Sequence, residues 1–172
     1  TLGGSAMVPG AAIADGSQIK TGINSSAVFE VGDGSRVKML PNSLVQVVTN
    51  RDYAMRDASS SGSTNWFSGL LRLAAGTMEA VAAKNVKRAT PLQVETPTSL
   101  VGVRGTEFRV AFDDPASASA RTEVVEGAVR ADNPAQGAGA ELPTGTGAVI
   151  RPAEREIRVV KLLPAPDLSN IP

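Results

Sequence analysis

The sequence predicts an all-β fold, arranged as an irregular β-helix-like or solenoid-like stack of short strands, with a β-sandwich as the alternative. Short runs rich in Val, Leu, Phe and Thr recur at intervals of about 8–12 residues, and each is closed by Gly, Asn, Asp or Pro. Aromatic residues make up only 3% of the 172-residue chain, so the core must be built mainly from aliphatic side chains. Several runs are apolar on both faces and turn at glycines without a strict repeat, which favours an irregular coil.

The first strands are predicted at residues 27–31 (AVFEV) and 36–40 (RVKML). Asp33-Gly34 between them indicates a tight turn, because glycine adopts positive φ without steric cost. A third strand is predicted at residues 43–48 (SLVQVV). Since both faces of this strand are apolar, we expect it to be covered on both sides.

Residues 50–68 break this pattern. Their Ser-rich centre, residues 58–64, predicts an exposed loop, and we place a loop insertion near residues 50–66. The paired aromatics Trp66-Phe67 then mark the return of order. Further strands are predicted at residues 69–73, 77–83, 92–95, 99–103, 106–112, 121–126, 128–131, 146–151 and 156–163, with loops at 113–120 and 133–140. Residues 77–86 also contain good helix formers, so a short helix is the alternative there.

Residues 1–162 are predicted to form one domain, because a chain of this length with 42% hydrophobic residues suits a single core. Residues 163–172 (LPAPDLSNIP) contain three prolines and predict an extended linker to a following domain. The chain has no apolar run of the length, about eighteen residues, that a membrane-spanning helix requires.

The composition disfavours most catalytic chemistries. The chain contains no Cys and no His, so it offers neither a thiolate nucleophile nor an imidazole for proton transfer or metal binding. We therefore expect no enzyme activity, no metal and no cofactor. Lys plus Arg equals Asp plus Glu at 17 each, which disfavours nucleic acid as a partner, because phosphate binding normally requires a basic excess.

The most distinctive block is TPTSLVGVRGTEFRV, residues 96–110, followed by VVEGAV at residues 124–129. Its glycines do not predict a phosphate-binding loop, because a strand rather than a helix follows them. They predict a structural corner, whose residues are Gly102, Arg104, Gly105, Thr106 and Phe108, with Gly127 in the second block. Alternation across residues 106–112 places Phe108 and Val110 in the core, while Glu107 and Arg109 face solvent or a partner.

Two groups of residues are candidates for interaction. Trp66 and Phe67 are suited to stacking against sugar rings, although, with one Trp in the chain, a small packing cluster is the more common role of such a pair. The cations Lys84, Lys87 and Arg88 could contact an anionic surface or polymer, whereas short basic runs are more often solvated turns.

The blocks GDGSRVKMLPNSLVQV, FSGLLRL, TPTSLVGVRGTEFRV and VVEGAVRA together resemble the FecR-like domain over roughly residues 16–151. This resemblance implies a solenoid-like β fold and a periplasmic, cell-surface or secreted location. In signalling members of that family, a periplasmic protein relays a message from an outer-membrane receptor to a sigma factor; other members are exported and associated with the cell wall.

From the resemblance we expect a non-catalytic envelope module that binds an envelope protein or peptidoglycan, with a role in cell-surface signal sensing. Two alternatives stay open. One is a glycan- or peptidoglycan-binding module that uses the Trp66-Phe67 region. The other is a periplasmic regulator of sigma-factor signalling.

Overall fold

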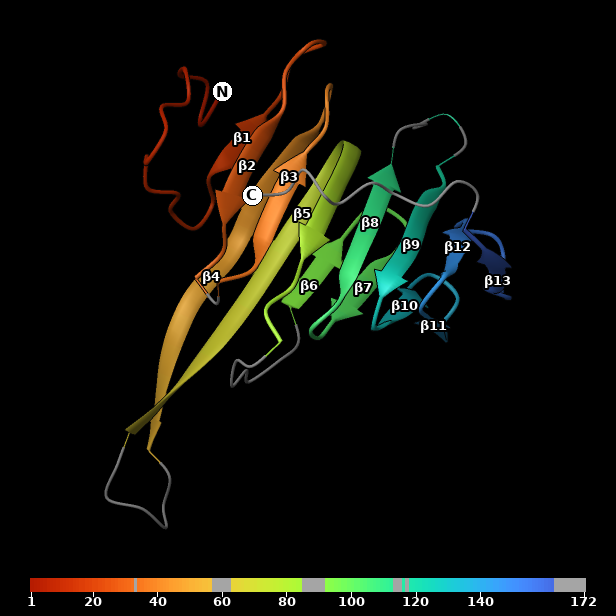
Figure 1. Cartoon of the computed structure of the whole chain (residues 1–172). Coiled ribbons are helices and arrows are strands. Elements are labelled where there is room, and N and C mark those ends of the chain that lie inside the picture. Colours follow the sequence, from red (N-terminus) through yellow and green to blue (C-terminus); the bar gives the residue numbers. More distant parts are fainter. Residues whose placement is uncertain (33, 57–62, 85–91, 113–115, 117, 163–172) are drawn as a thin grey trace.

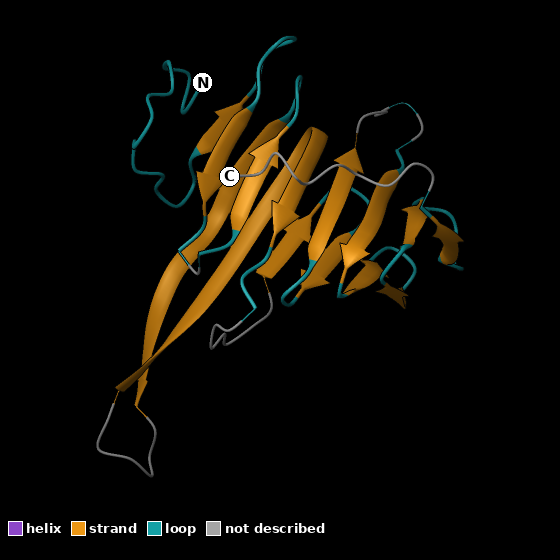
Figure 2. Ribbon diagram, in the orientation of Figure 1, coloured by secondary structure: helices purple, strands orange, loops and turns teal. Residues whose placement is uncertain are grey.

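The computed structural model describes residues 1–32, 34–56, 63–84, 92–112, 116 and 118–162. These residues form strands and loops without a helix (Figure 2). The thirteen strands are β1 (Gln18–Lys20), β2 (Ala27–Glu30), β3 (Arg36–Met39), β4 (Leu44–Arg56), β5 (Ser63–Val81), β6 (Leu92–Glu95), β7 (Leu100–Val103), β8 (Glu107–Phe112), β9 (Ala120–Glu126), β10 (Ala128–Asn133), β11 (Ala138–Pro143), β12 (Thr146–Ile150) and β13 (Arg158–Lys161).

The strands pair as one nearly closed, barrel-like sheet whose two layers share β5 (Figure 1). The β3 layer has the order β2-β3-β5-β8-β9-β12-β13, and the β4 layer has the order β1-β4-β5-β6-β7-β10-β11. Among the described strands, β5 and β6 are the one parallel pair. The all-β prediction is therefore confirmed. The two layers face each other across one core, and the described pairs other than β5–β6 are antiparallel.

The inward faces of the two layers meet in one aliphatic core. Because successive side chains on a strand point to opposite faces, every second residue of most strands is buried. The larger buried side chains are Val37, Met39, Met78, Phe108 and Ile150 from the β3 layer, and Ile19, Val45, Leu71, Leu73, Leu92 and Leu142 from the β4 layer.

Most predicted strands lie where the alternation places them, but the expected loop insertion near residues 50–66 differs from the structure. The backbone of β4 continues to Arg56 and that of β5 begins at Ser63, and the two pair as a long hairpin. This hairpin arm extends beyond the other strands (Figure 1). Its polar composition does not show the alternation expected of a strand that covers a core, which is the reason that the sequence pattern indicated a loop. Residues 57–62 and the predicted linker at 163–172 lie outside the described residues.

β5 passes from one layer to the other at Gly76. Up to Ala75 it pairs with β4, and from Gly76 onward it pairs with β8. Gly76 has a φ of 87°, and a Cβ at this position would lie 2.5 Å from the Cα of Ser43. The pairing of β5 with β4 ends at Ala75, so the Thr77 N–H has no partner in β4. The buried Ser43 hydroxyl accepts a hydrogen bond from this N–H at 2.9 Å. The crossing thus requires glycine at position 76.

We expect Gly76→Ala to destabilise the fold more than Gly145→Ala, its matched control. Gly145 also has a positive φ of 77°, but nothing lies within 4 Å of a Cβ built there. The control should therefore lose about 1–2 kcal/mol from the left-handed backbone alone. Gly76→Ala adds a clash with backbone, so denaturant titration should show a clearly larger loss; equal losses would contradict the close approach to Ser43.

Candidate functional site

Gly105, Thr106 and Gly127 form a tightly packed corner between β8 and β10. Gly105 has a φ of 61°, and the Thr106 hydroxyl donates to the Ala128 carbonyl at 2.9 Å. The Thr106 carbonyl accepts from the Ala82 N–H at 2.9 Å. Gly127 has a φ of 93°, and a Cβ there would lie 2.9 Å from the Thr106 hydroxyl oxygen. The corner therefore links Thr106 to Ala82 through a backbone hydrogen bond and to Ala128 through a hydroxyl hydrogen bond.

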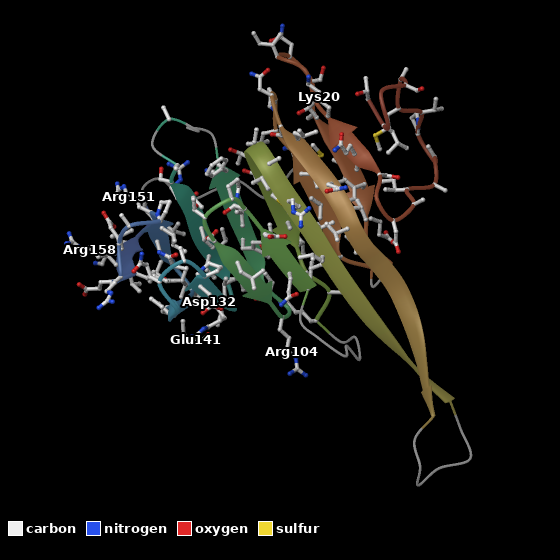
Figure 3. All side chains as sticks on the ribbon, turned by 180° about the vertical axis from the view of Figure 1, so that it is seen from behind. Lys20, Arg104, Asp132, Glu141, Arg151 and Arg158 are labelled. Atoms are coloured by element: carbon white, nitrogen blue, oxygen red, sulfur yellow. The ribbon has the colours of Figure 1, made fainter. Side chains whose placement is uncertain are left out.

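The other residues of the predicted corner lie on different surfaces. Gly102 is in β7, where its backbone partners are Gln93 and Arg130. Arg104 is exposed, and its side chain points away from the sheet (Figure 3). Phe108 is fully buried, in agreement with the alternation of β8.

Arg109 joins three strands through a charged row on the outer face of the β3 layer. Its neighbours across the ladder are Glu79 in β5 and Glu123 in β9. The Arg109 guanidinium donates to Glu79 at 2.6 Å and lies 3.5 Å from Glu123. The Glu79 side chain is 3% exposed and that of Arg109 is 21% exposed, so this face is far less solvated than the sequence pattern predicts. Arg121 lies 3.8 Å from Glu123, so two arginines balance the two carboxylates of this row, which indicates a role in strand registration.

The basic candidates are only partly described. Lys84 follows the end of β5 and donates a hydrogen bond to Glu126, and this bond raises the pKa of the Lys84 ammonium above its ordinary value. The pair is exposed, so it adds little to stability. Lys87 and Arg88 lie outside the described residues.

The aromatic candidates lie on the hairpin arm. The backbone register pairs Trp66 with Tyr53 and Phe67 with Asp52. Trp66 and Phe67 are near the start of β5, whereas Lys84 follows its end, so the structure does not bring the two candidate groups together. Glycan binding through Trp66 and Phe67 stays a prediction.

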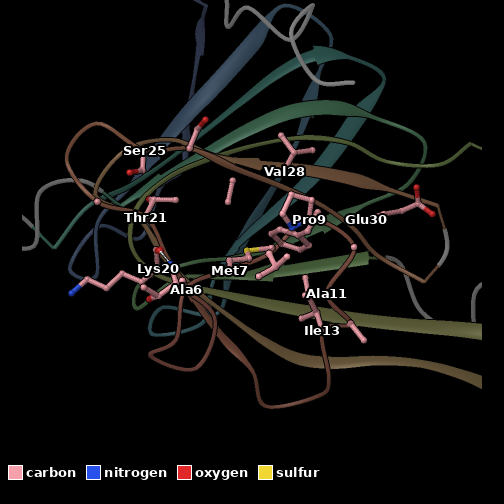
Figure 4. Close-up of a pocket in the computed structure, with 18 of the residues that line it drawn as sticks. Ala6, Met7, Pro9, Ala11, Ile13, Lys20, Thr21, Ser25, Val28 and Glu30 are labelled. Atoms are coloured by element: carbon pink, nitrogen blue, oxygen red, sulfur yellow. Dashed lines mark hydrogen bonds between the residues drawn. The ribbon is translucent and has the colours of Figure 1, made fainter.

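A cavity of about 1290 Å³ lies between the N-terminal segment and β2, and the sequence pattern did not reveal it. We call residues 6–13 the strap. Strap residues Met7, Pro9, Ala11 and Ile13 lie on one side of the cavity, with Val28 of β2 facing them (Figure 4). No sequence motif predicts this cavity, because the strap and β2 are separate in the sequence and are brought side by side only by the fold.

The described residues contain no group of three or more His, Cys, Asp or Glu side chains that could hold a metal ion. Within the same part of the chain, no helix is long and apolar enough to cross a membrane. The two layers end in the outer strands β2, β13, β1 and β11, and the cavity lies beside β2. An all-β module with these features is suited to binding a partner.

The chain belongs to the FecR family. The family model described as "FecR protein" matches residues 17–130, which include the charged row, the glycine corner and the hairpin arm. FecR proteins are regulators associated with the cell envelope, and the expected resemblance is thereby confirmed. Comparison with curated proteins found no match.

The fold is similar to two crystal structures of a candidate anti-sigma factor from Parabacteroides distasonis ATCC 8503. The TM-scores are 0.61 and 0.60, each with 16% sequence identity. In both cases the similarity covers 84% of this chain and 59% of the other chain. This chain thus spans less than two thirds of the length of the proteins that share its fold.

Proposed function

We propose that this chain is the envelope-side sensing module of a sigma-factor regulator. The observation that carries the proposal is membership of the FecR family, whose model matches residues 17–130. The fold shared with a candidate anti-sigma factor supports the same assignment. Among the functions that the sequence left open, sigma-factor regulation is therefore favoured over a general cell-wall attachment module.

In this proposal the module acts by binding a protein in the periplasm and performs no catalysis. The chain has no imidazole or thiol with which to move protons or attack a substrate. Its most buried charged side chains, Glu79, Arg109 and Glu123, form ion pairs across the sheet, with Arg121 as the second cation, and none of them lines the cavity beside β2. Its surface offers backbone edges at the outer strands, with exposed valines at Val28, Val159 and Val160, and such edges suit recognition of a protein segment.

The 59% coverage of the structural neighbours fits a module that works within a longer regulator. The sigma-factor contact itself would then belong to another part of that protein. The module described here would receive the signal by binding a protein partner. Binding of that partner would change how the rest of the regulator acts on the sigma factor.

Transcript profiling tests this proposal. In the cell that produces the protein, deletion of residues 17–150 from the full-length chain should change a limited set of genes that share one promoter class. An Arg72→Met variant is the matched control, because the Arg72–Glu95 pair is exposed and contributes little to the fold. If the deletion changed no promoter class in a coordinated way, the proposed function would be wrong.

A further inference from the structure

The edges of the two layers differ in how they are protected. Residues Thr1 and Gly3 cover the edge of β1, because the Gly3 N–H donates to Gln18 at 2.8 Å and the Lys20 N–H donates to Thr1 at 2.9 Å. The edge strand β13 is flanked by two cations, Arg158 and Lys161, and the edge strand β11 ends in proline. Covering, charge and proline are the usual means of preventing unwanted strand addition. The edge of β2 (AVFE) has only Glu30 at its end.

The β2 edge presents unpaired backbone groups at Val28 and Glu30. The Val31 N–H donates to Ser35 at 2.8 Å, so residues 31 and 35 form a hydrogen-bonded pair of the β2–β3 hairpin. Hydrogen-bonded pairs alternate along an antiparallel ladder, and the next is therefore Phe29 with Val37. It follows that the N–H and C=O groups of Val28 and Glu30 point away from β3. No backbone bond from another described element to these two residues is recorded.

The strap lies beside this edge without pairing with it. The backbone hydrogen bond recorded within residues 6–13 is the turn bond from Ala11 to Val8, at 3.1 Å. Met7 and Ile13 are the strap side chains that pack against the core. An irregular apolar segment thus covers the gap between the layers through two side chains and leaves the cavity of about 1290 Å³ beneath it. The composition of this segment shows that the gap accepts an apolar stretch of polypeptide.

We propose that the cavity beside β2 is a strand-addition site for an extended peptide segment of a partner protein, and that the strap moves aside when the segment binds. The backbone of the segment would pair with Val28 and Glu30, and its alternate apolar side chains would occupy the places of Met7 and Ile13. This inference rests on the proposed function, because it names the surface at which the module would meet its protein partner.

Charge at the two ends of the cavity specifies the partner further. Lys20 and Glu30 line the cavity from opposite sides (Figure 4). No ion pair of Glu30 with another described residue is recorded, so its carboxylate is available to a partner. The bound segment should therefore carry Lys or Arg at the end beside Glu30 and an acidic residue or chain terminus beside Lys20.

Selection from a library of random peptides tests the proposal and does not require the partner to be identified. The full chain is immobilised and exposed to peptides of about twelve residues, a length that spans an added strand and its flanks. We expect enrichment of peptides with alternating apolar residues and a cation at one end. Hydrogen exchange with the best peptide should slow at the Val28 and Glu30 amides in the unmodified chain.

Two proline variants separate strand addition at β2 from general adhesion to sheet edges. Val28→Pro removes an N–H that points away from β3, and Val159→Pro is the matched control at the opposite edge of the same layer. The Leu162 N–H donates to Gly145, so the same alternation turns the Val159 N–H away from β12. Val28 and Val159 are 40% and 46% exposed. Val28→Pro removes one hydrogen bond to the added strand and disturbs the backbone that pairs with it, so peptide affinity should fall about tenfold or more. Val159→Pro should bind the peptide with the affinity of the unmodified chain.

A third variant tests the role of the strap. Met7→Asp together with Ile13→Asp should loosen the strap and strengthen peptide binding several-fold, because the peptide no longer competes with it. The proposal is overturned if no peptide is enriched, if exchange slows elsewhere, or if both proline variants bind equally. The deletion of residues 17–150 separates the two proposals. If it changed one promoter class as expected while any of these results was obtained, sigma-factor regulation would still be supported and only the strand-addition site would be rejected.

Discussion

Phe108→Ala is expected to lower the free energy of unfolding by about 3–5 kcal/mol, the cost typical of truncating a fully buried aromatic side chain. Phe108 is fully buried and is the largest such side chain in the described core. It lies in β8, opposite Ala80 of β5 and Val124 of β9, at the centre of the β3 layer. Small neighbours on both sides cannot fill the space that the ring leaves, so a cavity should remain.

Chemical denaturation monitored by circular dichroism measures this loss. Val28→Ala is the control, because Val28 is 40% exposed and its truncation should cost well under about 1 kcal/mol. A loss below about 1 kcal/mol for Phe108→Ala would show that β8 has a different register, since a core aromatic cannot be removed so cheaply.

Arg109→Met is expected to cost about 2–4 kcal/mol, because it leaves the largely buried Glu79 carboxylate without a cation and leaves Glu123 only the more distant Arg121, at 3.8 Å. The Glu79 and Glu123 side chains are 3% and 9% exposed, and both are salt-bridged to Arg109. The estimate is below that for a fully buried pair because the Arg109 side chain keeps about a fifth of its surface in solvent. Methionine preserves most of the side-chain volume, so the loss reports the charge.

Arg72→Met provides the comparison for this effect. Arg72 and Glu95 are also neighbours across a ladder and lie 3.0 Å apart, but their side chains are 46% and 38% exposed. An exposed pair contributes about 0–1 kcal/mol. If the two substitutions had equal effects in the same denaturation experiment, the charged row at Arg109 would not contribute to the fold as described.

The sequence was sufficient for most strands because their alternation is local. In β8 the pattern TEFRV shows which residues are buried without reference to any neighbouring strand. The glycine corner was also readable, because a positive φ at Gly105 and Gly127 is a local requirement of the turns. The family resemblance came from these same blocks.

The features that the sequence did not reveal depend on distant pairs. Glu107 and Arg109 have the same polar signature, yet Arg109 is covered because Glu79 is brought beside it from thirty residues away. The hairpin arm gains its structure from pairing between β4 and β5, which alternation within either strand does not show. The cavity depends on the position of the strap beside β2. The strap residues, AMVPGAAI, carry no sequence pattern other than small size and apolar character.

The proposed site gives the regulator a physical means of sensing. A free edge at Val28 and Glu30 supplies backbone affinity, and the displaced strap couples occupancy to the N-terminal end of the module. The strap is held mainly by Met7 and Ile13, so a partner strand has few contacts to replace. The edge strand β13, with cations at both ends, should remain unpaired throughout.

Transcript profiling of single-residue variants tests this account most directly. In the cell that produces the full-length protein, Val28→Pro should change the same promoter class as deletion of residues 17–150, while Val159→Pro should leave expression unchanged. Thermal unfolding of both purified variants should first show that each is folded. If folded Val28→Pro protein gave the expression pattern of the unmodified protein, the β2 edge would not be where this module receives its signal.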